Sequence, residues 1–504
     1  TNILRNEWGF KGLVMTDWFG GKSPSSQISA GNDLLEPGTN KQWKALTKAV
    51  KNGELSMDAI DRATKRILTL IFKTKKMQNY RFNNSPDLKK HAGITRNSAA
   101  EGMVLLKNEN SLPFTNEKNI ALLGITSYEF IAGGTGSGDV NEAYTISLEE
   151  GFLNAGFKIN KTAKKIVESH RKVNSDGFIK PQGLGAIFSP FSPPEIIYTT
   201  DQINDIVATS DIGVLTLGRN SGEGGDRSEK NDFLLTKTEQ EMIVKFTDAF
   251  HKKNKKVIVV LNIGGVIETA SWKHLPDAIL LAWQGGQEGG NSVVDILSGK
   301  INPSGKLPMT FPVKLSDHKS HKNFPKNPKM ITIEGLVKNL IFPPNETPKA
   351  HKVKDEDYTF YHEDVFVGYR HFDSKNLSVS FPFGFGLSYT DFKYSPMKLE
   401  IENDTINISL NIKNIGAFPG KEVVQFYTEK LNSIIKRPSQ ELKSFAKTKR
   451  LENNESINVS VKIPIIELSY WNETINDWSL EKGEYNIKVG GSSRNISQIL
   501  KITL

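Results

Sequence analysis

Apolar runs divide the first 84 residues into strand-like and helical segments. Residues 13–18 (LVMTDW) carry three apolar side chains directly into a carboxylate and an indole. Ser56 is a favourable helix N-cap. Apolar residues recur at helical spacing after it: Ile60, Ala63, Ile67 and Ile71. Strand, loop and amphipathic helix in succession are typical of a (β/α) barrel, but so short a piece cannot close one. We therefore predict that residues 1–84 are the C-terminal part of a (β/α)8 barrel.

Residues 88–312 alternate short apolar runs with helical patterns. Four runs have the composition of buried strands: Asn119–Gly124, Ile212–Gly218, Val257–Leu261 and Ala278–Trp283. Helices are expected over Thr236–Lys252 and Gly290–Leu297. This alternation predicts an α/β sandwich domain with a mostly parallel sheet and helices on both faces. In such a sheet, ligands gather beyond the C-terminal ends of the strands.

The hydrophobic period changes after a polar connector, residues 313–380, which is rich in Lys, Pro and His and ends in a strand-like segment, Val365–Arg370. Within residues 381–504, apolar and polar positions alternate, as at Ile406, Ile408, Leu410 and Ile412. Period two with turn residues between the runs predicts an antiparallel β-sandwich of immunoglobulin or fibronectin type III kind. The predicted fold class is therefore α/β: a barrel remnant, an α/β sandwich and a C-terminal fibronectin type III-like β-sandwich.

Composition narrows the classes of partner. No apolar run approaches the roughly 18 residues that span a bilayer, so no membrane partner is predicted. The net charge of +9 comes from scattered lysines rather than a basic stripe, which argues against nucleic acid. There is no cysteine, and the nine histidines are dispersed, so we expect neither a metal site nor a cofactor. The chain begins with Thr1, and we interpret it as lacking an N-terminal portion, which leaves the compartment unassigned. The oligomeric state is not predicted.

Asp17 is the first candidate catalytic residue. It stands at the C-terminal end of a predicted parallel strand, where catalytic groups of (β/α) barrels lie. Trp18 offers a flat surface on which a sugar ring can pack. The alternative is an aspartate that caps the following turn beside an ordinary half-buried tryptophan, and the segment alone does not decide between the two.

Glu223 is the second candidate, in a glycine-flanked loop after the predicted strand Ile212–Gly218. The neighbouring Asp226 and Arg227 could bias its protonation. A solvated acidic loop is the simpler interpretation of this segment alone. Together with Asp17, however, Glu223 would supply the two carboxyl groups that glycoside hydrolysis needs.

Another glycine-rich loop, residues 133–139, lacks the Gly-Lys-Ser/Thr of a phosphate-binding loop. That absence argues against a nucleotide-dependent enzyme. A loop folded over a neutral ligand fits better, and a plain surface turn is the alternative.

Eight segments, in this order, resemble glycoside hydrolase family 3 in its bacterial three-domain β-glucosidase branch. They are residues 9–18 (GFKGLVMTDW), 30–35 (AGNDLL), 101–108 (EGMVLLKN), 133–139 (GGTGSGD), 221–227 (SGEGGDR), 286–291 (GQEGGN), 302–308 (NPSGKLP) and 381–390 (FPFGFGLSYT). Each segment is modest alone, but eight in the family's order are highly specific. The similarity runs essentially from Thr1 to Leu504.

The resemblance implies a retaining exo-acting hydrolase that releases terminal β-D-glucosyl residues from small oligosaccharides or from aryl or alkyl β-glycosides. By the family pattern, Asp17 is the nucleophile and Glu223 the acid/base. Trp18 forms a wall of the sugar subsite, and Ser137 contacts the sugar from the second domain. The alternatives within the family are β-xylosidase and α-L-arabinofuranosidase. A non-catalytic carbohydrate-binding remnant is a further alternative.

One departure from the family pattern affects the expected activity. The family's earlier barrel strands supply Asp, Arg and Lys-His residues that bind sugar hydroxyls, and these would precede Thr1. Such hydrogen bonds strengthen in the transition state, so we expect the isolated chain to be inactive or nearly so. A periplasmic or secreted location is plausible by the resemblance alone.

Overall fold

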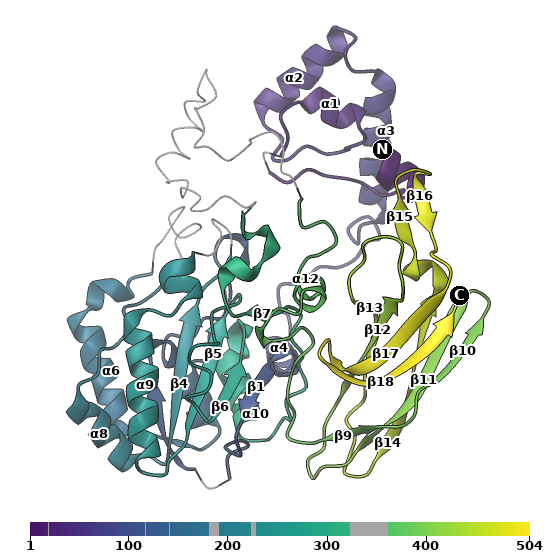
Figure 1. Cartoon of the computed structure of the whole chain (residues 1–504). Coiled ribbons are helices and arrows are strands. Elements are labelled where there is room, and N and C mark those ends of the chain that lie inside the picture. The colour runs from purple at the N-terminus through teal and green to yellow at the C-terminus, as the bar shows by residue number, and fades with distance from the viewer. Residues whose placement is uncertain (19, 116, 141, 181–190, 223–227, 323–360) are drawn as a thin grey trace. The chain divides into compact units, whose positions relative to one another are not determined.

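The computed structural model describes the chain except residues 19, 116, 141, 181–190, 223–227 and 323–360. The chain divides into two compact units, Thr1–Leu88 and Lys89–Leu504. Figure 1 shows the elements of both. None of the described helices is both long and apolar enough to cross a membrane.

The first unit is built from three helices and a short π-helical turn, Asn2–Glu7. The helices are α1 (Pro24–Ser29), α2 (Asn40–Lys51) and α3 (Met57–Lys73). Ser56 caps α3 as predicted, since its Oγ accepts a hydrogen bond from the amide of Ala59 at 3.3 Å. A small core joins the helices: Ile28, Leu35, Ala49, Leu55 and Ala59.

The predicted strand at residues 13–17 is reduced to one isolated parallel bridge and is only partly buried. Met15 forms a parallel bridge with Leu34, and the amide of Thr16 donates to the carbonyl of Leu34 at 3.0 Å. Met15 is 55% exposed, although three apolar residues in a row, Leu13–Met15, are typical of a buried strand. The reason is that only one neighbouring segment of the described unit pairs with this strand. Similarly, Ile71 of α3 is exposed although Ala63 is buried.

The second unit contains a six-stranded sheet in the order β1-β6-β5-β4-β2-β3. Its strands are β1 (Val104–Asn108), β2 (Asn119–Leu123), β3 (Lys158–Ile159), β4 (Ile212–Arg219), β5 (Val257–Ile263) and β6 (Ala278–Leu281). All neighbours pair in parallel except β1 with β6. Every residue of β5 and β6 is buried, as expected for strands covered on both faces. The four predicted strands and the mostly parallel sheet are confirmed.

Among the described residues, the helices that accompany this sheet are α4 (Leu88–Gly102), α5 (Leu148–Asn154), α6 (Lys161–Val173), α8 (Thr200–Thr209), α9 (Lys237–His251) and α10 (Gly289–Leu297). Helix α8 packs against both α6 and α9, whereas α5 packs against α10. Helix α9 begins at a capping box, in which Thr236 and Glu239 satisfy each other's backbone amides. The predicted helices over Thr236–Lys252 and Gly290–Leu297 are therefore confirmed.

The C-terminal part is an antiparallel β-sandwich, as predicted. One sheet holds β9 (Phe392–Tyr394), β10 (Lys398–Glu402), β11 (Thr405–Asn414) and β14 (Ser456–Pro464). The other holds β12 (Val423–Lys430), β13 (Glu441–Lys447), β17 (Glu484–Ser492) and β18 (Asn495–Thr503). A short hairpin, β15 (Tyr470–Asn472) and β16 (Asp477–Ser479), lies outside both sheets. The alternating isoleucines of β11 point into the core between the sheets.

The predicted strand over Val365–Arg370 is wrong. Gly368 has φ of +57°, and a helix, α12 (Tyr369–Ser374), begins directly after it. The ring of Tyr369 stacks on Phe383 at 4.5 Å, and its hydroxyl accepts a hydrogen bond from the amide of Leu442. The glycine therefore ends the extended segment, and packing of Tyr369 on the sandwich fixes the helix. Nearby, β7 (Phe311–Pro312) pairs with β8 (Val379–Phe381).

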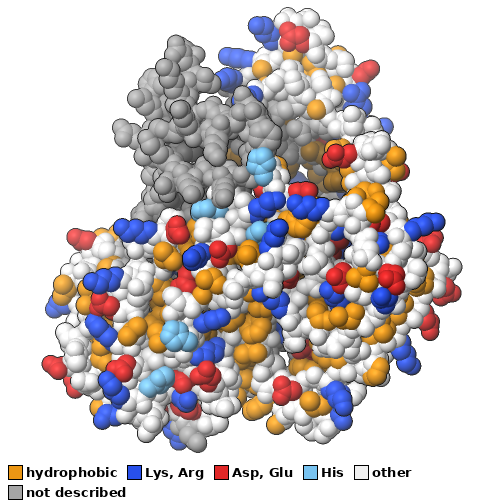
Figure 2. All heavy atoms as spheres, in the orientation of Figure 1, with side chains coloured by type: hydrophobic (Ala, Val, Ile, Leu, Met, Phe, Trp, Pro, Cys, Tyr) orange, Lys and Arg blue, Asp and Glu red, His pale blue; other side chains and the backbone are white. Residues whose placement is uncertain are grey.

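Charged side chains of both signs are interspersed over the face of the second unit shown in Figure 2. Among the described residues, no group of three or more His, Asp or Glu side chains is placed to hold a metal ion.

Candidate active site

Asp17 and Trp18 follow the parallel bridge of the first unit and lie at the C-terminal end of that strand. Both side chains are exposed, Trp18 by 62%. The carbonyl of Asp17 accepts a hydrogen bond from the amide of Gly20 at 3.1 Å, which turns the chain immediately after the tryptophan. The structure thus places the predicted nucleophile where a ligand can reach it from solvent.

Asp33 fixes the strand that carries Asp17. Its buried carboxylate pairs with Arg5 at 2.6 Å and with Arg66 of α3 at 2.7 Å. It also accepts a hydrogen bond from the amide of Val14 at 2.9 Å, three residues before Asp17. The guanidinium of Arg5 donates in turn to the carbonyl of Gly12 at 2.9 Å. Because charge-assisted hydrogen bonds are short and directional, this network sets the position of the strand relative to α3.

In the second unit, the structure brings the glycine-rich loop at residues 133–139 next to Ser221 and Gly222, the two residues that precede Glu223. Thr135 forms a parallel bridge with Gly222, and its amide donates to the carbonyl of Ser221 at 3.2 Å. A Cβ atom on Gly222 would lie 2.3 Å from the amide nitrogen of Thr135, so this close approach requires a glycine. Ser137 lies in a short 3₁₀ turn, Gly136–Gly138, with its side chain exposed.

Glu223, Asp226 and Arg227 lie outside the described residues. The separation between the carboxyl groups of Asp17 and Glu223 therefore stays a prediction. The described residues place the Ser137 loop beside Gly222, which directly precedes Glu223.

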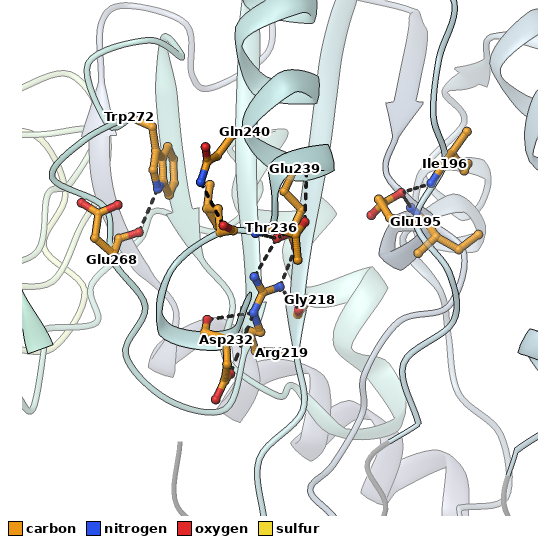
Figure 3. Close-up of polar contacts among 12 residues, drawn as sticks. Glu195, Ile196, Gly218, Arg219, Asp232, Thr236, Glu239, Gln240, Glu268 and Trp272 are labelled. Carbon is orange, nitrogen blue, oxygen red and sulfur yellow. Dashed lines mark hydrogen bonds and ion pairs between the residues drawn. The ribbon is translucent and has the colours of Figure 1, made fainter. Parts of the chain in front are cut away.

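Arg219, the last residue of β4, is held by the segment that follows the Glu223 loop (Figure 3). Its guanidinium makes two hydrogen bonds to the carboxylate of Glu239, at 2.6 and 2.7 Å, and its Nε donates to the carbonyl of Asp232 at 2.9 Å. Arg219 and Glu239 are both largely buried. The bidentate pair joins the end of β4 to the first turn of α9 and fixes both ends of the intervening segment.

A cavity of about 820 Å³ opens beyond β2 and β4 at the C-terminal edge of the sheet. Thr135 and Asn220 form part of its wall, so it adjoins the joined loops. A ligand site at this edge was expected from the parallel sheet, and the volume is in the usual range for small-molecule sites.

Glu195 also lines this cavity. Its Oε1 accepts hydrogen bonds from the amides of Ile125 and Ile196, at 2.9 and 2.8 Å. Desolvation raises the pKa of Glu195 to about 7, although these two amides and Arg219 act in the opposite direction. Glu195 can therefore exist in either protonation state near neutral pH.

An ion pair completes the described wall, with Nη2 of Arg171 in α6 at 2.6 Å from Oε1 of Glu129. The Arg171 guanidinium lies over the ring of Tyr128, 5.9 Å from its centroid.

Sequence reasoning missed Arg171, Glu195 and Arg219. Of these three residues, only Arg219 could have been identified from the sequence, because it directly follows the predicted strand Ile212–Gly218. Glu195 and Arg171 lie in segments for which the sequence pattern predicted neither a strand end nor a motif.

Comparison of the chain with models of known protein families shows which family it belongs to. The model of the glycosyl hydrolase family 3 C-terminal domain matches residues 103–389, more than half of the chain. The chain belongs to glycosyl hydrolase family 3. The model of the family's N-terminal domain matches residues 1–70, and that of a fibronectin type III-like domain matches residues 422–493. The predicted resemblance is therefore confirmed.

Individual family 3 relatives include thermostable beta-glucosidase B of Acetivibrio thermocellus, which is 33% identical over 98% of this chain and 59% of its own length. An exo-alpha-(1->6)-L-arabinopyranosidase of Bifidobacterium breve is 28% identical over all of this chain and 60% of the relative. Among solved structures, beta-glucosidase 3B from Thermotoga neapolitana in complex with alpha-D-glucose has a TM-score of 0.88 and 38% identity. That match covers 100% of this chain and 67% of the solved one. The chain thus spans about 60% of the length of these two curated relatives.

Proposed function

We propose that the protein containing this chain is a retaining, exo-acting β-glucosidase that releases terminal β-D-glucosyl residues from small oligosaccharides or aryl and alkyl β-glucosides. The observation that carries the proposal is the match of essentially the whole chain to beta-glucosidases of its family, at 33% and 38% identity. The solved relative is a glucose complex, which supports a glucose-sized sugar as the group that is bound.

In the proposed mechanism, the carboxylate of Asp17 attacks the anomeric carbon of the terminal sugar. The bond to the leaving-group oxygen breaks as the carboxylic acid of Glu223 protonates that oxygen. The carboxylate of Glu223 then takes a proton from water as the water oxygen attacks the same carbon, which releases the sugar and regenerates Asp17. The two carboxyl groups would stand about 5–5.5 Å apart, the separation typical of retaining enzymes.

Trp18 and Ser137 are proposed to hold the sugar. The exposed indole of Trp18 directly follows Asp17 and offers a surface for one face of the ring. The hydroxyl of Ser137 is exposed in a loop that is tied to the segment before Glu223. These positions support a contact between Ser137 and a sugar hydroxyl close to the acid/base.

The second candidate is a pentose-releasing exo-hydrolase with the same catalytic pair. A relative named as an exo-arabinopyranosidase, at 28% identity, favours including a six-membered pentose ring among the substrates tested. A β-xyloside, an α-L-arabinopyranoside and an α-L-arabinofuranoside therefore belong beside the β-glucoside in one nitrophenyl glycoside panel.

The test is made in the complete protein that contains these 504 residues. Replacing Asp17 by Ala should lower turnover of p-nitrophenyl β-glucoside by at least about 10⁴-fold, because the covalent step is lost. The matched control is Asp61→Ala, an exposed aspartate of α3, which should leave turnover unchanged. Residual turnover within tenfold of the unsubstituted enzyme would exclude Asp17 as the nucleophile.

Glu223 is tested by chemical rescue. Glu223→Ala should lose turnover of alkyl glucosides, and azide should restore reaction of an activated aryl glucoside with formation of β-glucosyl azide. Glu229→Ala, at an exposed glutamate just after the loop, serves as the control. A Glu223→Ala enzyme that azide does not accelerate would contradict the acid/base assignment.

A further inference from the structure

Thr16 directly precedes Asp17, and the two side chains differ in exposure. Thr16 is buried, whereas Asp17 is exposed. Successive side chains of an extended segment point to opposite faces, so the carboxylate of Asp17 stays accessible while the hydroxyl of Thr16 points into the first unit. There its Oγ1 accepts a hydrogen bond from the backbone amide of Glu36 at 2.8 Å. The proposed mechanism gives this buried hydroxyl no part in the chemistry, which leaves its contact with Glu36 to be explained.

Residues 33–36 hold the segment before the proposed nucleophile through a series of hydrogen bonds. The amides of Asp33 and Leu34 both donate to the carbonyl of Val14, at 2.9 and 3.2 Å. The amide of Thr16 donates in turn to the carbonyl of Leu34 at 3.0 Å. The bond at the hydroxyl of Thr16 is therefore the contact of this series that lies nearest to the catalytic carboxylate along the chain.

A threonine suits this task because its branched Cβ atom limits rotation of the side chain, which keeps the hydroxyl directed toward its partner. The rate of reaction between two groups is sensitive to their separation, and a displacement of about 1 Å can lower it about 100-fold. Neighbouring Cα atoms are joined by one planar peptide unit. Freeing the backbone at Thr16 therefore widens the range of positions of the Asp17 carboxylate, although no bond to that carboxylate is lost.

We propose that Thr16 is a positioning residue for the nucleophile: the hydrogen bond between its hydroxyl and the amide of Glu36 sets where the carboxylate of Asp17 meets the anomeric carbon. The inference rests on the proposed role of Asp17 as the nucleophile and adds a residue to the structure that holds it in place.

The first measurement is kcat/KM for dinitrophenyl β-glucoside in the complete protein, because this quantity includes the attack by Asp17. Thr16→Val keeps the shape of the side chain but removes the hydroxyl, and it should lower kcat/KM about tenfold. Thr16→Ser keeps the hydroxyl and should restore most of the lost rate. The matched control is Thr69→Val, at an exposed threonine of α3 whose Oγ1 donates to the carbonyl of Lys65 at 2.7 Å. It should leave kcat/KM unchanged.

The second measurement separates positioning from a general loss of structure. In Asp17→Ala, azide from solution takes the place of the missing carboxylate. Its terminal nitrogen bonds to the anomeric carbon as the bond to the aryl oxygen breaks, which yields α-glucosyl azide and dinitrophenolate. Because azide is not attached to the chain, Thr16→Val should change the azide-dependent rate by less than about twofold in this background. An equal loss in both backgrounds would overturn the proposal, since Thr16 would then serve the fold or the sugar site as a whole.

An unchanged kcat/KM in Thr16→Val would also overturn the proposal. Where Thr16→Val does not fold, Thr16→Ala is measured in its place, because alanine leaves space rather than a methyl group against the amide of Glu36.

Failure of the proposed function gives a different result: the unsubstituted protein hydrolyses no glycoside of the panel, or azide does not accelerate Asp17→Ala. The placement of the Asp17 segment is then measured by amide hydrogen exchange in the complete protein. Peptides that cover residues 13–18 should exchange about tenfold faster in Thr16→Val than in the unsubstituted protein, and at an unchanged rate in Thr69→Val. Exchange that is equal in all three proteins would overturn the proposal.

Discussion

The carboxyl group of Glu195 accepts hydrogen bonds from the backbone, and yet its pKa is raised. Two backbone amides donate to its Oε1, which favours the charged form, but desolvation is the larger effect and raises the pKa to about 7. Nearby Glu239 disfavours the charge further, whereas Arg219 favours it. The folded protein therefore holds this proton more tightly than the unfolded chain, in which the pKa is near 4.5.

We expect this difference to make Glu195 a source of pH-dependent stability. Between about pH 4.5 and 7 the folded state binds the proton and the unfolded state does not, so stability falls as pH rises through this window. Glu195→Gln keeps an oxygen for the two amides and cannot ionise. It should match the unsubstituted protein near pH 4.5 and exceed its free energy of unfolding by about 2–3 kcal/mol at pH 8. Urea unfolding at both pH values measures the difference, and an equal or lower stability of the variant at pH 8 would contradict the pKa.

At the scale of elements, several family segments serve packing more directly than chemistry. Gly290, within residues 286–291, lies where helix α10 crosses α5, and a Cβ atom there would come within 2.0 Å of the carbonyl of Ser147. Gly151 of α5 faces the same contact, because its Cβ would lie 2.5 Å from the carbonyl of Gly290. The two helices can approach this closely only because each carries a glycine at the crossing.

Gly290→Ala should therefore destabilise the protein by about 2–3 kcal/mol, since backbone must shift to admit the methyl group. Gly93→Ala is the matched control. Gly93 lies in α4, and nothing described is within 4 Å of its Cβ position, so alanine should stabilise that helix by roughly 0.5–1 kcal/mol. Chemical unfolding followed by far-ultraviolet circular dichroism compares the two. Equal effects of both substitutions would show that helix propensity, not the crossing, governs Gly290.

The sequence predicted well those elements whose burial follows a regular pattern, either continuous or alternating. Strands β4, β5 and β6 are largely buried on both faces and mostly apolar, and β11 alternates because only one of its faces is buried. The segment Val365–Arg370 has a similar composition, but Gly368 and the packing of Tyr369 convert it to a turn and a helix.

Contacts between loops could not be predicted in the same way. The pairing of Thr135 with Gly222, and the approach of Glu195 to the amide of Ile125, depend on the order of strands in the sheet. That order is a non-local property that no local pattern reports. The sequence therefore indicated the loop that carries Ser137, but not the wall of the cavity beside it.

At the scale of the whole second unit, the last two family segments join the α/β part to the β-sandwich. The side-chain oxygen of Asn302 accepts hydrogen bonds from the amide of Tyr389 and the hydroxyl of Ser388, at 2.8 and 2.9 Å. Its amide nitrogen donates to the carbonyl of Pro419 at 3.0 Å. One side chain thus links residues 302–308, residues 381–390 and the sandwich, which gives these two family segments a role in packing.

An ion-pair cluster also links the α/β part to the β-sandwich. Its charges make the stability of this junction depend on pH. Glu101 of α4 pairs with Lys421 and Lys447 of the sandwich. Desolvation opposes ionisation of Glu101, but hydrogen bonds from the two lysines outweigh it and lower its pKa below the usual 4.5. The stabilisation is therefore present above about pH 4.5 and is lost as pH falls through the lowered value.

Glu101→Gln should accordingly reduce the free energy of unfolding at pH 7 by about 0.5–1 kcal/mol, a modest amount because the carboxylate is 36% exposed and screened by solvent. The deficit should shrink as pH falls from 7 to 3, because the carboxyl group of the unsubstituted protein becomes protonated as pH falls through its lowered pKa. Glu400→Gln, at an exposed position of β10, should have no measurable effect at either pH. Urea unfolding at pH 7 and pH 3 tests this, and added salt should reduce the difference at pH 7. A deficit that persists undiminished at pH 3 would mean that Glu101 stabilises the junction through packing and not through its charge.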